Sequence, residues 1–409
     1  MKIGIISNLY PPFVRGGAEM IASLQAQGLK KSWQHVFVIS TKPRFKIPSL
    51  GFWSSYKTTE DIVEDVPVFR FWPVNFYYYL DDWKFPGPMR LLWHLVDIFN
   101  IFSYLTVKKI LKQQKPEVVI THNLMGLGFL IPHLLKKLNI RHIHILHDVQ
   151  GVTPSGLIIL GQEKSWQHKF FKMIGYVKLM RHLFGSPEIV ISPSRFLLNF
   201  YGDSGFFKNS KKYVLPNPVK ALLDLPKRPS PNLHLLYVGQ ITKAKGILDL
   251  IASFRKLKLP HVRLHVVGTG PDFNQAKKLA GPDKRIIFYG WLKKGQAGIL
   301  YTKVDLLVMP SLCYENSPTV IYEALSFGIP VLAADIGGAG ELIEDGKNGW
   351  IFAAGDFSAL NQKILLLYKQ REKISGLADR CRQSVAPYVL ENYIGKLLDI
   401  INNEQREKI

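Results

Sequence analysis

The segment 304-VDLLVMPSLCYENSPTVIYEALSFGIPVLAAD-335 decides the fold. Two continuous apolar runs, VDLLVMP and IPVLAAD, enclose a loop and a stretch of helical length. Continuous apolar runs are typical of strands in a parallel sheet that is covered on both faces. The segment therefore predicts a strand, a loop at its carboxyl end, a helix and a second strand.

The same alternation extends over the rest of the chain. The apolar runs before Pro231 are KIGIIS, HVFVIS, EVVITH, HIHILH, EIVISP and KYVLP, and those after it are HLLYVG, RLHVVG, RIIFYG, VDLLVMP, IPVLAAD and GWIFA. Two successive series of strands and helices predict two doubly wound, Rossmann-like α/β domains with parallel sheets. Because ligands bind at the carboxyl ends of parallel strands, two such domains face to face would place the active site in the cleft between them.

The domain boundary is expected in residues 216–232, which hold five prolines among polar and basic residues. Such a composition predicts a linker. We therefore expect an N-terminal domain at residues 1–216 and a C-terminal domain at residues 217–387. The amphipathic, helical stretch 388–409 is expected to pack back on the first domain.

Ser317 and Pro318 mark the predicted start of the helix within the first segment. Serine is a favoured N-cap, and proline is a favoured first helical residue. The backbone amides of Thr319 and Val320 are then unpaired donors at the positive end of the helix dipole. This arrangement suits the binding of a diphosphate.

Two glutamates lie on either side of this helix start. Glu315 precedes the cap and can reach the hydroxyls of a transferred sugar, whereas Glu323 lies ~9 Å further along the helix axis, where it could accept from a ribose. Two glutamates at this spacing also occur by chance, so a structural role is the alternative. The Ser-Pro cap between them favours a nucleotide-sugar site.

Glycine-containing turns follow the first strand of each domain. Gly16 and Gly17 after the first strand would let the backbone approach a phosphate, although a plain strand-to-helix turn is the alternative, and the dinucleotide fingerprint GxGxxG is absent. In the second domain, Gly239 ends a strand and Lys245 precedes a helix. Lys245 could neutralise a departing diphosphate, and a solvated surface lysine is the alternative.

Histidines gather in the run HIHILHDV. His142 and His144 share one face of a strand, while His147 and Asp148 lie at its carboxyl end. A His₃ metal site is conceivable, but we expect packed or hydrogen-bonded histidines and no metal. His147 is a candidate for a role near the anomeric centre, and His122 is a second candidate.

The chain carries 53 Lys and Arg against 31 Asp and Glu, a formal net charge of +22. Residues 1–220 hold 28 of the basic and 13 of the acidic residues, and so +15 of this charge. The excess implies an anionic partner: nucleic acid, an acidic membrane or a phosphorylated substrate. Signatures of RRM, KH and zinc-finger domains are absent, so we expect no nucleic acid.

The sequence predicts a cytoplasmic protein. The two cysteines, Cys313 and Cys381, lack metal-ligand spacing and favour a reducing compartment. The first apolar run stops at Asn8, too early for a secretory signal. The stretch 91–107 contains Asp97 and is interpreted as an amphipathic helix, because an aspartate at mid-bilayer is costly.

Residues 164–185, KSWQHKFFKMIGYVKLMRHLFG, combine an apolar helical stripe with flanking Lys and Arg. This is the pattern of a helix at a membrane interface, so we expect peripheral contact with an anionic membrane. Apolar residues on the opposite side make a core helix the alternative. The aromatic run at 71–83 is either a second acceptor or membrane surface, or loop packing.

Taken together, the motifs resemble the retaining glycosyltransferase family 4, of GT-B fold. The resemblance covers essentially the whole chain through PPFVRGGAE, SPS at 192–194, PNPV at 216–219, VGQITKAKG, GTGP, PSLCYENSP, EAL, GIPVLAADIGG and GELIEDGKNGWIF. It implies that the Gly16 amide and Lys245 hold the diphosphate together with the amides at the helix start. It further implies that Glu315 binds the sugar and Glu323 the ribose, that His147 lies beside the reacting centre, and that the base packs near Leu292.

One residue departs from the family pattern. Many members have an arginine where this chain has Gln240, which can hydrogen-bond to a phosphate but carries no charge. Lys245, alone or together with Lys243, must therefore supply the neutralisation. The mechanism that the resemblance implies is a metal-independent, front-face transfer without a cofactor, in which the leaving diphosphate accepts the proton of the acceptor hydroxyl.

The expected function is transfer of a hexose from a UDP- or GDP-sugar to a lipid-linked or polysaccharide-precursor acceptor at the inner face of the cytoplasmic membrane. One alternative is a GT-B enzyme that makes a soluble sugar product or epimerises a nucleotide sugar. The others are a basic nucleic-acid-binding protein and a non-catalytic scaffold.

Overall fold

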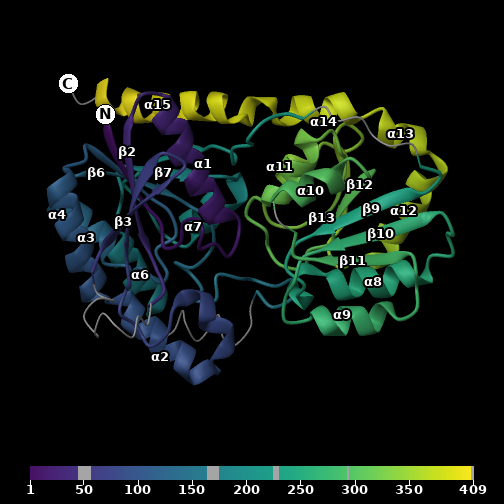
Figure 1. Ribbon diagram of the computed structural model, residues 1–409, viewed down its shortest axis with the longest axis horizontal. Helices are drawn as coiled ribbons and strands as arrows, with labels where there is room; N and C mark the ends of the chain where they lie inside the picture. The colour runs from purple at the N-terminus through teal and green to yellow at the C-terminus, as the bar shows by residue number, and fades with distance from the viewer. Residues whose placement is uncertain (45–56, 164–174, 224–229, 293, 407–409) are drawn as a thin grey trace. The chain divides into compact units, whose positions relative to one another are not determined.

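The computed structural model describes residues 1–44, 57–163, 175–223, 230–292 and 294–406 (Figure 1). The chain forms two compact units. The first consists of Met1–Leu157, Ser165–Pro218 and Leu390–Ile409. The second consists of Ile158–Lys164 and Val219–Val389.

The first unit is built on an eight-stranded sheet with the order β3-β4-β2-β1-β5-β6-β7-β8. Its neighbouring strands are parallel, except that β3 and β4 form an antiparallel pair at one edge. The strands are β1 (Lys2–Ile6), β2 (His35–Thr41), β3 (Thr59–Val63), β4 (Val66–Phe71), β5 (Val118–Thr121), β6 (Arg141–Ile145), β7 (Ile189–Ser192) and β8 (Lys211–Val214). The helices are α1 (Gly17–Lys31), η2 (Tyr79–Lys84), α2 (Gly87–Ile98), α3 (Ile101–Gln114), α4 (Ile131–Lys137), α6 (Tyr176–Phe184), α7 (Arg195–Asp203) and α15 (Leu390–Arg406).

The second unit is built on a six-stranded parallel sheet with the order β11-β10-β9-β12-β13-β14. The strands are β9 (Leu233–Val238), β10 (Val262–Val267), β11 (Ile286–Gly290), β12 (Leu306–Met309), β13 (Val331–Asp335) and β14 (Gly349–Ala353). The helices are η3 (Lys243–Lys245), α8 (Ile247–Lys256), α9 (Phe273–Ala280), α10 (Lys294–Tyr301), α11 (Thr319–Ser326), η4 (Gly340–Leu342), α12 (Phe357–Lys369), α13 (Arg371–Ser375), α14 (Ala378–Val385) and η5 (Ala386–Tyr388). This order is that of a doubly wound Rossmann-like sheet.

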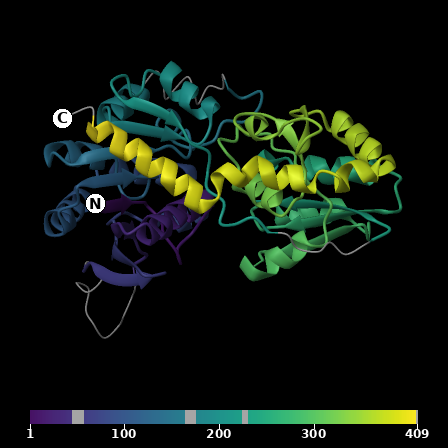
Figure 2. The same ribbon diagram turned by 90° about the horizontal axis from the view of Figure 1, so that it is seen from above.

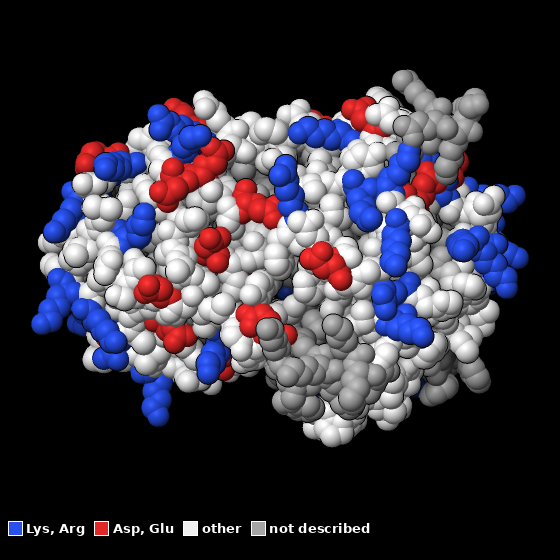
Figure 3. Space-filling view, turned by 180° about the vertical axis from the view of Figure 1, so that it is seen from behind, with Lys and Arg blue, Asp and Glu red and all other residues white. Residues whose placement is uncertain are grey.

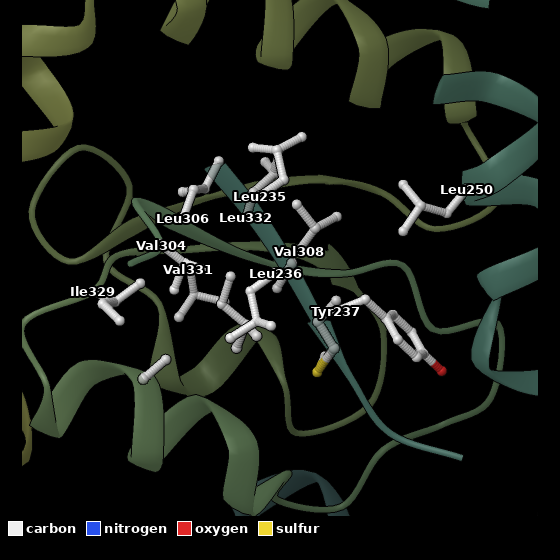
Figure 4. Packing of buried hydrophobic residues seen from close by; sticks show 14 of the residues in the cluster. Leu235, Leu236, Tyr237, Leu250, Val304, Leu306, Val308, Ile329, Val331 and Leu332 are labelled. Atoms are coloured by element: carbon white, nitrogen blue, oxygen red, sulfur yellow. The ribbon is translucent and has the colours of Figure 1, made fainter. Parts of the chain in front are cut away.

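Each sheet is buried where the sequence has continuous apolar runs. The four residues of β5, β7 and β12 are all buried. Figure 4 shows side chains of three neighbouring strands, among them Leu235, Leu306 and Leu332, packed together in the core of the second unit. The predicted pair of doubly wound α/β units is therefore confirmed, since the helices cover sheets whose central strands expose no polar face.

Two details of the first sheet differ from the sequence prediction. The strands β3 and β4 were not predicted: β3 is exposed and not apolar, whereas β4 is an apolar, largely buried run that was not recognised as a strand. The run KYVLP does form β8, but this strand lies at the opposite edge and is largely exposed. An edge strand packs against fewer neighbours, so its residues carry a weaker apolar signal.

The C-terminal helix α15 belongs to the first unit (Figures 1 and 2). Its residues Tyr393, Ile394 and Leu397 join the core beside β1 and α1. Tyr393 accepts a hydrogen bond from Gln25 at 2.6 Å. At Gly28 an added Cβ would lie 2.5 Å from Ile394, so the two helices need a glycine where they touch.

The stretch predicted as one amphipathic helix at 91–107 is divided between α2 and α3. Asn100 interrupts it because its side chain accepts from the Ser103 amide and caps α3. A capping side chain satisfies an amide that has no partner in the helix and so favours a new helix start. None of the helices in the described ranges is both long and apolar enough to cross a membrane.

One short segment packs in a different unit from its neighbours in the sequence. Residues 158–163 lie within the N-terminal half of the sequence but pack in the second unit. Ile159 forms an antiparallel bridge with Cys313, and Leu160 donates to the Leu312 carbonyl at 2.8 Å. The segment therefore acts as a strap on the loop after β12, a pairing that spans some 150 residues of sequence and leaves no local signal.

Candidate active site

The carboxyl edge of the second sheet brings two loops together between β9 and β12. These neighbouring strands lead to opposite sides of the sheet, since β9 continues to β10 and β12 to β13. Ligands of doubly wound folds bind at such a reversal of strand order. The loop after β9 carries Gly239, Gln240 and Lys245, and the loop after β12 carries Glu315 and Ser317.

Lys245 and Glu315 form an ion pair in this place. The Lys245 Nζ lies 2.6 Å from the Glu315 Oε1, and the two side chains are 27% and 14% exposed. Ser311 Oγ donates to the same carboxylate oxygen at 2.8 Å. Burial alone lowers the pKa of the Lys245 ammonium, but the adjacent Glu315 carboxylate and Cys313 thiol outweigh it and raise the pKa above its usual value. The site thus holds a charged lysine.

A glycine fixes the position of Lys245. Gly246 has φ of +69°, and a Cβ added there would lie 1.8 Å from the Pro310 carbonyl oxygen. The same loops are joined by a hydrogen bond of 2.9 Å from the Leu312 amide to the Ala244 carbonyl. The close approach of two backbones therefore needs glycine at residue 246 and places Lys245 beside the loop after β12.

The backbone of Glu315 is held from both sides. On one side, its carbonyl accepts from the Gly338 amide at 2.6 Å. On the other, the preceding Tyr314 donates its amide to Ile158 at 2.9 Å and its hydroxyl to Glu163 at 2.9 Å. The strap and the loop after β13 thus orient the carboxylate toward Lys245.

The helix start differs by one residue from the prediction. Pro318 is the N-cap of α11, with an extended backbone, and the helix begins at Thr319. Ser317 is not the cap, because its hydroxyl is engaged with the Tyr322 hydroxyl at 2.7 Å. The amides of Thr319 and Val320 still lie in the first turn, where a helix offers no carbonyl partner. The two amides that were expected to bind a diphosphate thus lie at the start of α11.

The two other residues of the second unit that were expected to contact the donor are Glu323 and Leu292. Glu323 is exposed on α11, and its Oε2 accepts from the Tyr301 hydroxyl at 3.3 Å. Leu292 follows β11 and is half-buried against the core of the unit. The structure leaves the Glu323 carboxylate accessible to a polar ligand.

Gly239 and Gln240 form the turn after β9. The Tyr237 hydroxyl donates to the Gln240 carbonyl at 2.8 Å. A Cβ added at Gly268 would lie 1.9 Å from the Gly239 carbonyl oxygen, so the GTG turn packs directly on this one. The Gln240 side chain is exposed. The turn is therefore rigid, and its side chain is available to solvent.

In the first unit, Gly16 caps α1 at the carboxyl edge of the sheet, and the helix begins at Gly17. The Gly16 amide donates to the Glu19 Oε2 at 2.9 Å. The Glu19 carboxylate thus accepts a hydrogen bond from the amide that the sequence analysis assigned to a phosphate. Carboxylates and phosphates compete for the same helix N-terminus, so a phosphate would bind this amide only by displacing Glu19.

His147 also lies at this edge and is paired with another histidine. Its Nε2 lies 2.7 Å from the Nδ1 of the fully buried His122, whose Nε2 has no hydrogen-bond partner among the described residues. Burial lowers the pKa of His147 to about 4. Burial also raises the pKa of Asp148 to about 7, although the Gln150 amide donates to it. His147 is therefore neutral near pH 7 and can donate or accept a hydrogen bond.

The other two histidines are structural. Thr121 Oγ1 lies 2.7 Å from the His142 Nε2 and 2.8 Å from the His144 Nδ1. Within the described ranges no three His, Cys, Asp or Glu side chains gather as a metal site. A cavity of about 10 Å³, room for one water, lies between His122, His144 and Asp148.

Part of the stretch 164–185 lies outside the described residues. Its described end forms α6, where Met180, Leu183 and Phe184 are buried. These residues make α6 a core helix. The expected membrane contact through residues 164–174 concerns residues that the structure does not describe.

Sequence reasoning found Lys245 and Glu315 but missed the residues that hold them. Ser311 lies four residues before Glu315, and this spacing was the available signal. Glu19 stands in the quoted GGAE motif, three residues after Gly16, at the spacing of a capping box. Neither side chain reveals its partner without the fold.

Comparisons with known proteins identify the family of this chain. A family model described as Glycosyltransferase Family 4 matches residues 15–221, and one described as Glycosyl transferases group 1 matches residues 225–384. The "Uncharacterized 42.6 kDa protein in cps region" of Klebsiella pneumoniae is 26% identical over 346 residues, which are 84% of this chain and 87% of the relative.

Two solved structures share the fold. Sucrose-phosphate synthase from Thermosynechococcus elongatus superimposes with a TM-score of 0.77 and 17% identity, covering 98% of each chain. Anabaena HepE in complex with UDP superimposes with a TM-score of 0.70 and 17% identity, covering 98% of this chain and 100% of HepE.

Proposed function

This chain belongs to glycosyltransferase family 4 and is a glycosyltransferase of the GT-B type, and from that premise we propose that it is a retaining hexosyltransferase. The donor would be a UDP- or GDP-sugar, and the acceptor a lipid-linked or polysaccharide-precursor glycan. The observation that carries the proposal is the pair of Lys245 and Glu315 beside the first turn of α11.

The donor would bind across this pair. Lys245 would contact the diphosphate, because its ammonium is charged and lies beside Glu315, whereas Gln240 is neutral. The amides of Thr319 and Val320 would donate to the same phosphates. Gly239 would allow the phosphates to approach the turn after β9.

The remaining contacts would fix the two ends of the donor. Glu315 would accept from hydroxyls of the sugar and Glu323 from hydroxyls of the ribose, with the base against Leu292. In the first unit, the Gly16 and Gly17 backbone would contribute to phosphate binding. His147 would form a hydrogen bond near the anomeric carbon in its neutral form.

The relatives support the two substrate classes. HepE was solved in complex with UDP, which supports a nucleotide-sugar donor. The Klebsiella relative is named for its position in a cps region, which supports a polysaccharide-precursor acceptor. We place the protein in the cytoplasm, peripherally at the inner membrane face, where a lipid-linked acceptor would be reached.

The transfer would proceed on one face of the sugar. The bond from the anomeric carbon to the diphosphate oxygen breaks, and a bond to the acceptor oxygen forms on the same face. The leaving diphosphate takes the proton of the acceptor hydroxyl. Lys245 and the first turn of α11 would stabilise the charge that develops on the diphosphate, a contribution on the order of several kcal/mol. We expect neither a metal ion nor another cofactor.

The test is nucleotide binding and turnover by Lys245→Ala. Thermal unfolding with UDP, GDP, ADP and their sugars should show one nucleotide that stabilises the wild type by ~2.7 kcal/mol at about a hundred times its Kd. Lys245→Ala should lose most of this shift and at least about tenfold in turnover.

Lys347→Ala is the matched control, since Lys347 pairs with Glu344 at 2.8 Å but is 68% exposed. It should bind and turn over as the wild type does. Turnover by Lys245→Ala at the wild-type rate would remove the proposed diphosphate site.

A further inference from the structure

The outward surface of α2 and of the first turns of α3 is apolar. Of the 22 large hydrophobic residues that are exposed in the described part of the chain, ten lie between Phe76 and Leu105. They are Phe76, Trp83, Met89, Leu91, Leu92, Leu95, Val96, Phe99, Ile101 and Leu105. We call these ten residues the α2 surface. Soluble proteins rarely expose a contiguous apolar area of this kind outside an interaction site.

The amphipathic pattern of α2 is inverted. Leu91, Leu92 and Leu95 are 50%, 50% and 53% exposed, and positions three and four apart share a helix face. The opposite face carries Trp93 and Asp97, which are both 1% exposed. A surface helix of a water-soluble unit normally turns its leucines inward and its aspartate outward.

Hydrogen bonds fix this inverted orientation. The Asp97 Oδ2 accepts from the Gly126 amide at 2.8 Å, and the Trp93 Nε1 donates to the Tyr77 carbonyl at 2.9 Å. Asn75 donates to the Trp93 carbonyl at 3.2 Å. The helix is thereby held in the first unit through Trp93 and Asp97, and the leucines are exposed.

The exposed charges on α2 and α3 are of one sign, whereas in η2 Asp81 and Asp82 pair with Lys84 and Arg90 at 2.6 Å and 2.8 Å. Between Gly87 and Lys115 the sequence has one acidic residue, the buried Asp97. The exposed charged residues of this range are Arg90, Lys109, Lys112 and Lys115. In Figure 3 the lower edge of the first unit, where α2 lies, is white where it is not grey. An apolar area bordered by basic side chains complements an anionic lipid surface.

We infer that the α2 surface docks on an anionic phospholipid membrane at the boundary of headgroups and acyl chains. The leucines and Phe99 enter the apolar layer, while Lys109 and Lys112 meet the lipid phosphates. A second copy of this chain is a poorer occupant, because it would bring the same basic side chains face to face.

The docking would bring the site to its acceptor, a consequence that rests on the proposed function. The ring of Trp93 stacks on Tyr79 at 5.9 Å, and the Tyr79 ring lies 4.7 Å from the Arg15 guanidinium. Arg15 precedes Gly16 at the carboxyl edge of the first sheet. The inner face of α2 therefore connects the membrane to the edge that carries His147, where a lipid-linked acceptor would be presented.

The test is sedimentation of the full chain with vesicles of phosphatidylcholine alone or with about 30 mol% phosphatidylglycerol. We expect the wild type to bind the anionic vesicles, and Leu92→Ser/Leu95→Ser to bind about tenfold more weakly. The matched control is Leu365→Ser/Leu366→Ser on α12, where the residues are 38% and 45% exposed. It should bind as the wild type does. Lys109→Gln/Lys112→Gln should bind more weakly only to the anionic vesicles.

Three outcomes would overturn the inference. The first is a wild type that binds neither vesicle, and the second is Leu92→Ser/Leu95→Ser binding at the wild-type level. The third is a wild-type dimer that this variant dissociates, without vesicle binding by either. Unfolding temperatures show that each variant is folded. The response to UDP and GDP is recorded on the same samples, because its absence would contradict the proposed function and leave membrane docking standing.

Discussion

Gly246 shows how a residue without a side chain positions the charge of the site. Its φ of +69° and its contact with the Pro310 carbonyl leave no room for a Cβ. Lys245 comes directly before Gly246. It reaches Glu315 because the backbone at Gly246 lies against the backbone at Pro310. The sequence predicted Lys245 and Glu315 separately, as a cation for phosphate and an acid for sugar. It could not predict that they are 2.6 Å apart.

We expect Gly246→Ala to reduce turnover at least about tenfold, because a contact of 1.8 Å must be relieved by moving the loop that carries Lys245. The control is Gly346→Ala, where φ is +73° and nothing lies within 4 Å of an added Cβ. The left-handed backbone should cost both variants ~1 kcal/mol of stability, and the backbone clash should add to this loss only in Gly246→Ala. Turnover and thermal unfolding are measured on both. Equal turnover in the two variants would show that the position of Lys245 does not depend on Gly246.

Ser317 is the residue for which local rules failed. A serine before a proline is a common helix cap, and the sequence prediction used this rule. In the structure the Ser317 hydroxyl is engaged with Tyr322, and the cap passes to Pro318. Whether the Ser317 hydroxyl caps the helix or bonds to Tyr322 depends on tertiary packing. The spacing of residues in the sequence does not predict this choice.

At the scale of elements, α11 joins the loop of Glu315 to a row of backbone donors. It begins at Thr319 directly after an extended Pro318 with ψ of 119°. An extended residue before a helix tolerates proline at the next position. The first turn of α11 can therefore lose one amide while the helix is kept.

Thr319→Pro should weaken binding of the nucleoside diphosphate about tenfold, because one charge-assisted hydrogen bond is lost. Proline is tolerated at the first helical position, so far-UV circular dichroism should be unchanged. Thr319→Ala keeps the amide and should bind as the wild type does. Calorimetric titration with UDP and GDP measures the affinities. An unaltered affinity of Thr319→Pro would exclude this amide from the phosphate site.

Elements also show where periodicity is informative. Runs such as VVIT and LLVM predicted buried strands correctly, because a strand inside a parallel sheet is apolar on both faces. The strand β3 escaped prediction because it is exposed and carries no apolar run. The break between α2 and α3 escaped because it depends on the Asn100 side chain and not on apolar spacing.

At the scale of the whole molecule, buried titratable groups should make the free energy of unfolding depend on pH. Burial lowers the pKa of His142 to about 3 and the pKa of His147 and His265 to about 4. The unfolded chain binds these protons near pH 6.5 and the folded chain does not. The free energy of unfolding should therefore fall as the pH falls from about 6.5 to about 4, by ~1.4 kcal/mol per pH unit for each group.

Two aspartates change the free energy of unfolding with pH in the opposite direction. Burial raises the pKa of Asp97 to about 8 and that of Asp148 to about 7. The folded chain keeps these protons when the unfolded chain has lost them, so their contribution is lost as the pH rises toward 8. Below pH 6.5 the effect of the three histidines on the free energy of unfolding exceeds the opposite effect of the two aspartates. Above pH 6.5 only the aspartates change it with pH. We expect the highest unfolding temperature at a pH of about 6.5.

Scanning calorimetry from pH 4 to 9 measures this profile. Asp97→Asn/Asp148→Asn should remove the decline above pH 6.5 and keep the decline below it. A profile that rises steadily to pH 9 in the wild type, or a variant that keeps the alkaline decline, would contradict the assignment of these carboxyl groups.

The sequence by itself determined the two series of strands, the residue types at the strand ends and the family. These features depend on neighbours within one or two turns of chain, and local periodicity records such neighbours. Only the tertiary structure decided that residues 158–163 brace the loop of Glu315, that the carboxylate meets Lys245 at 2.6 Å, and that α2 turns its leucines outward. Lys245 and Glu315 are 70 residues apart, and Ile158 and Tyr314 are further apart still. Contacts at such separations arise from the packing of whole elements, which no local pattern encodes.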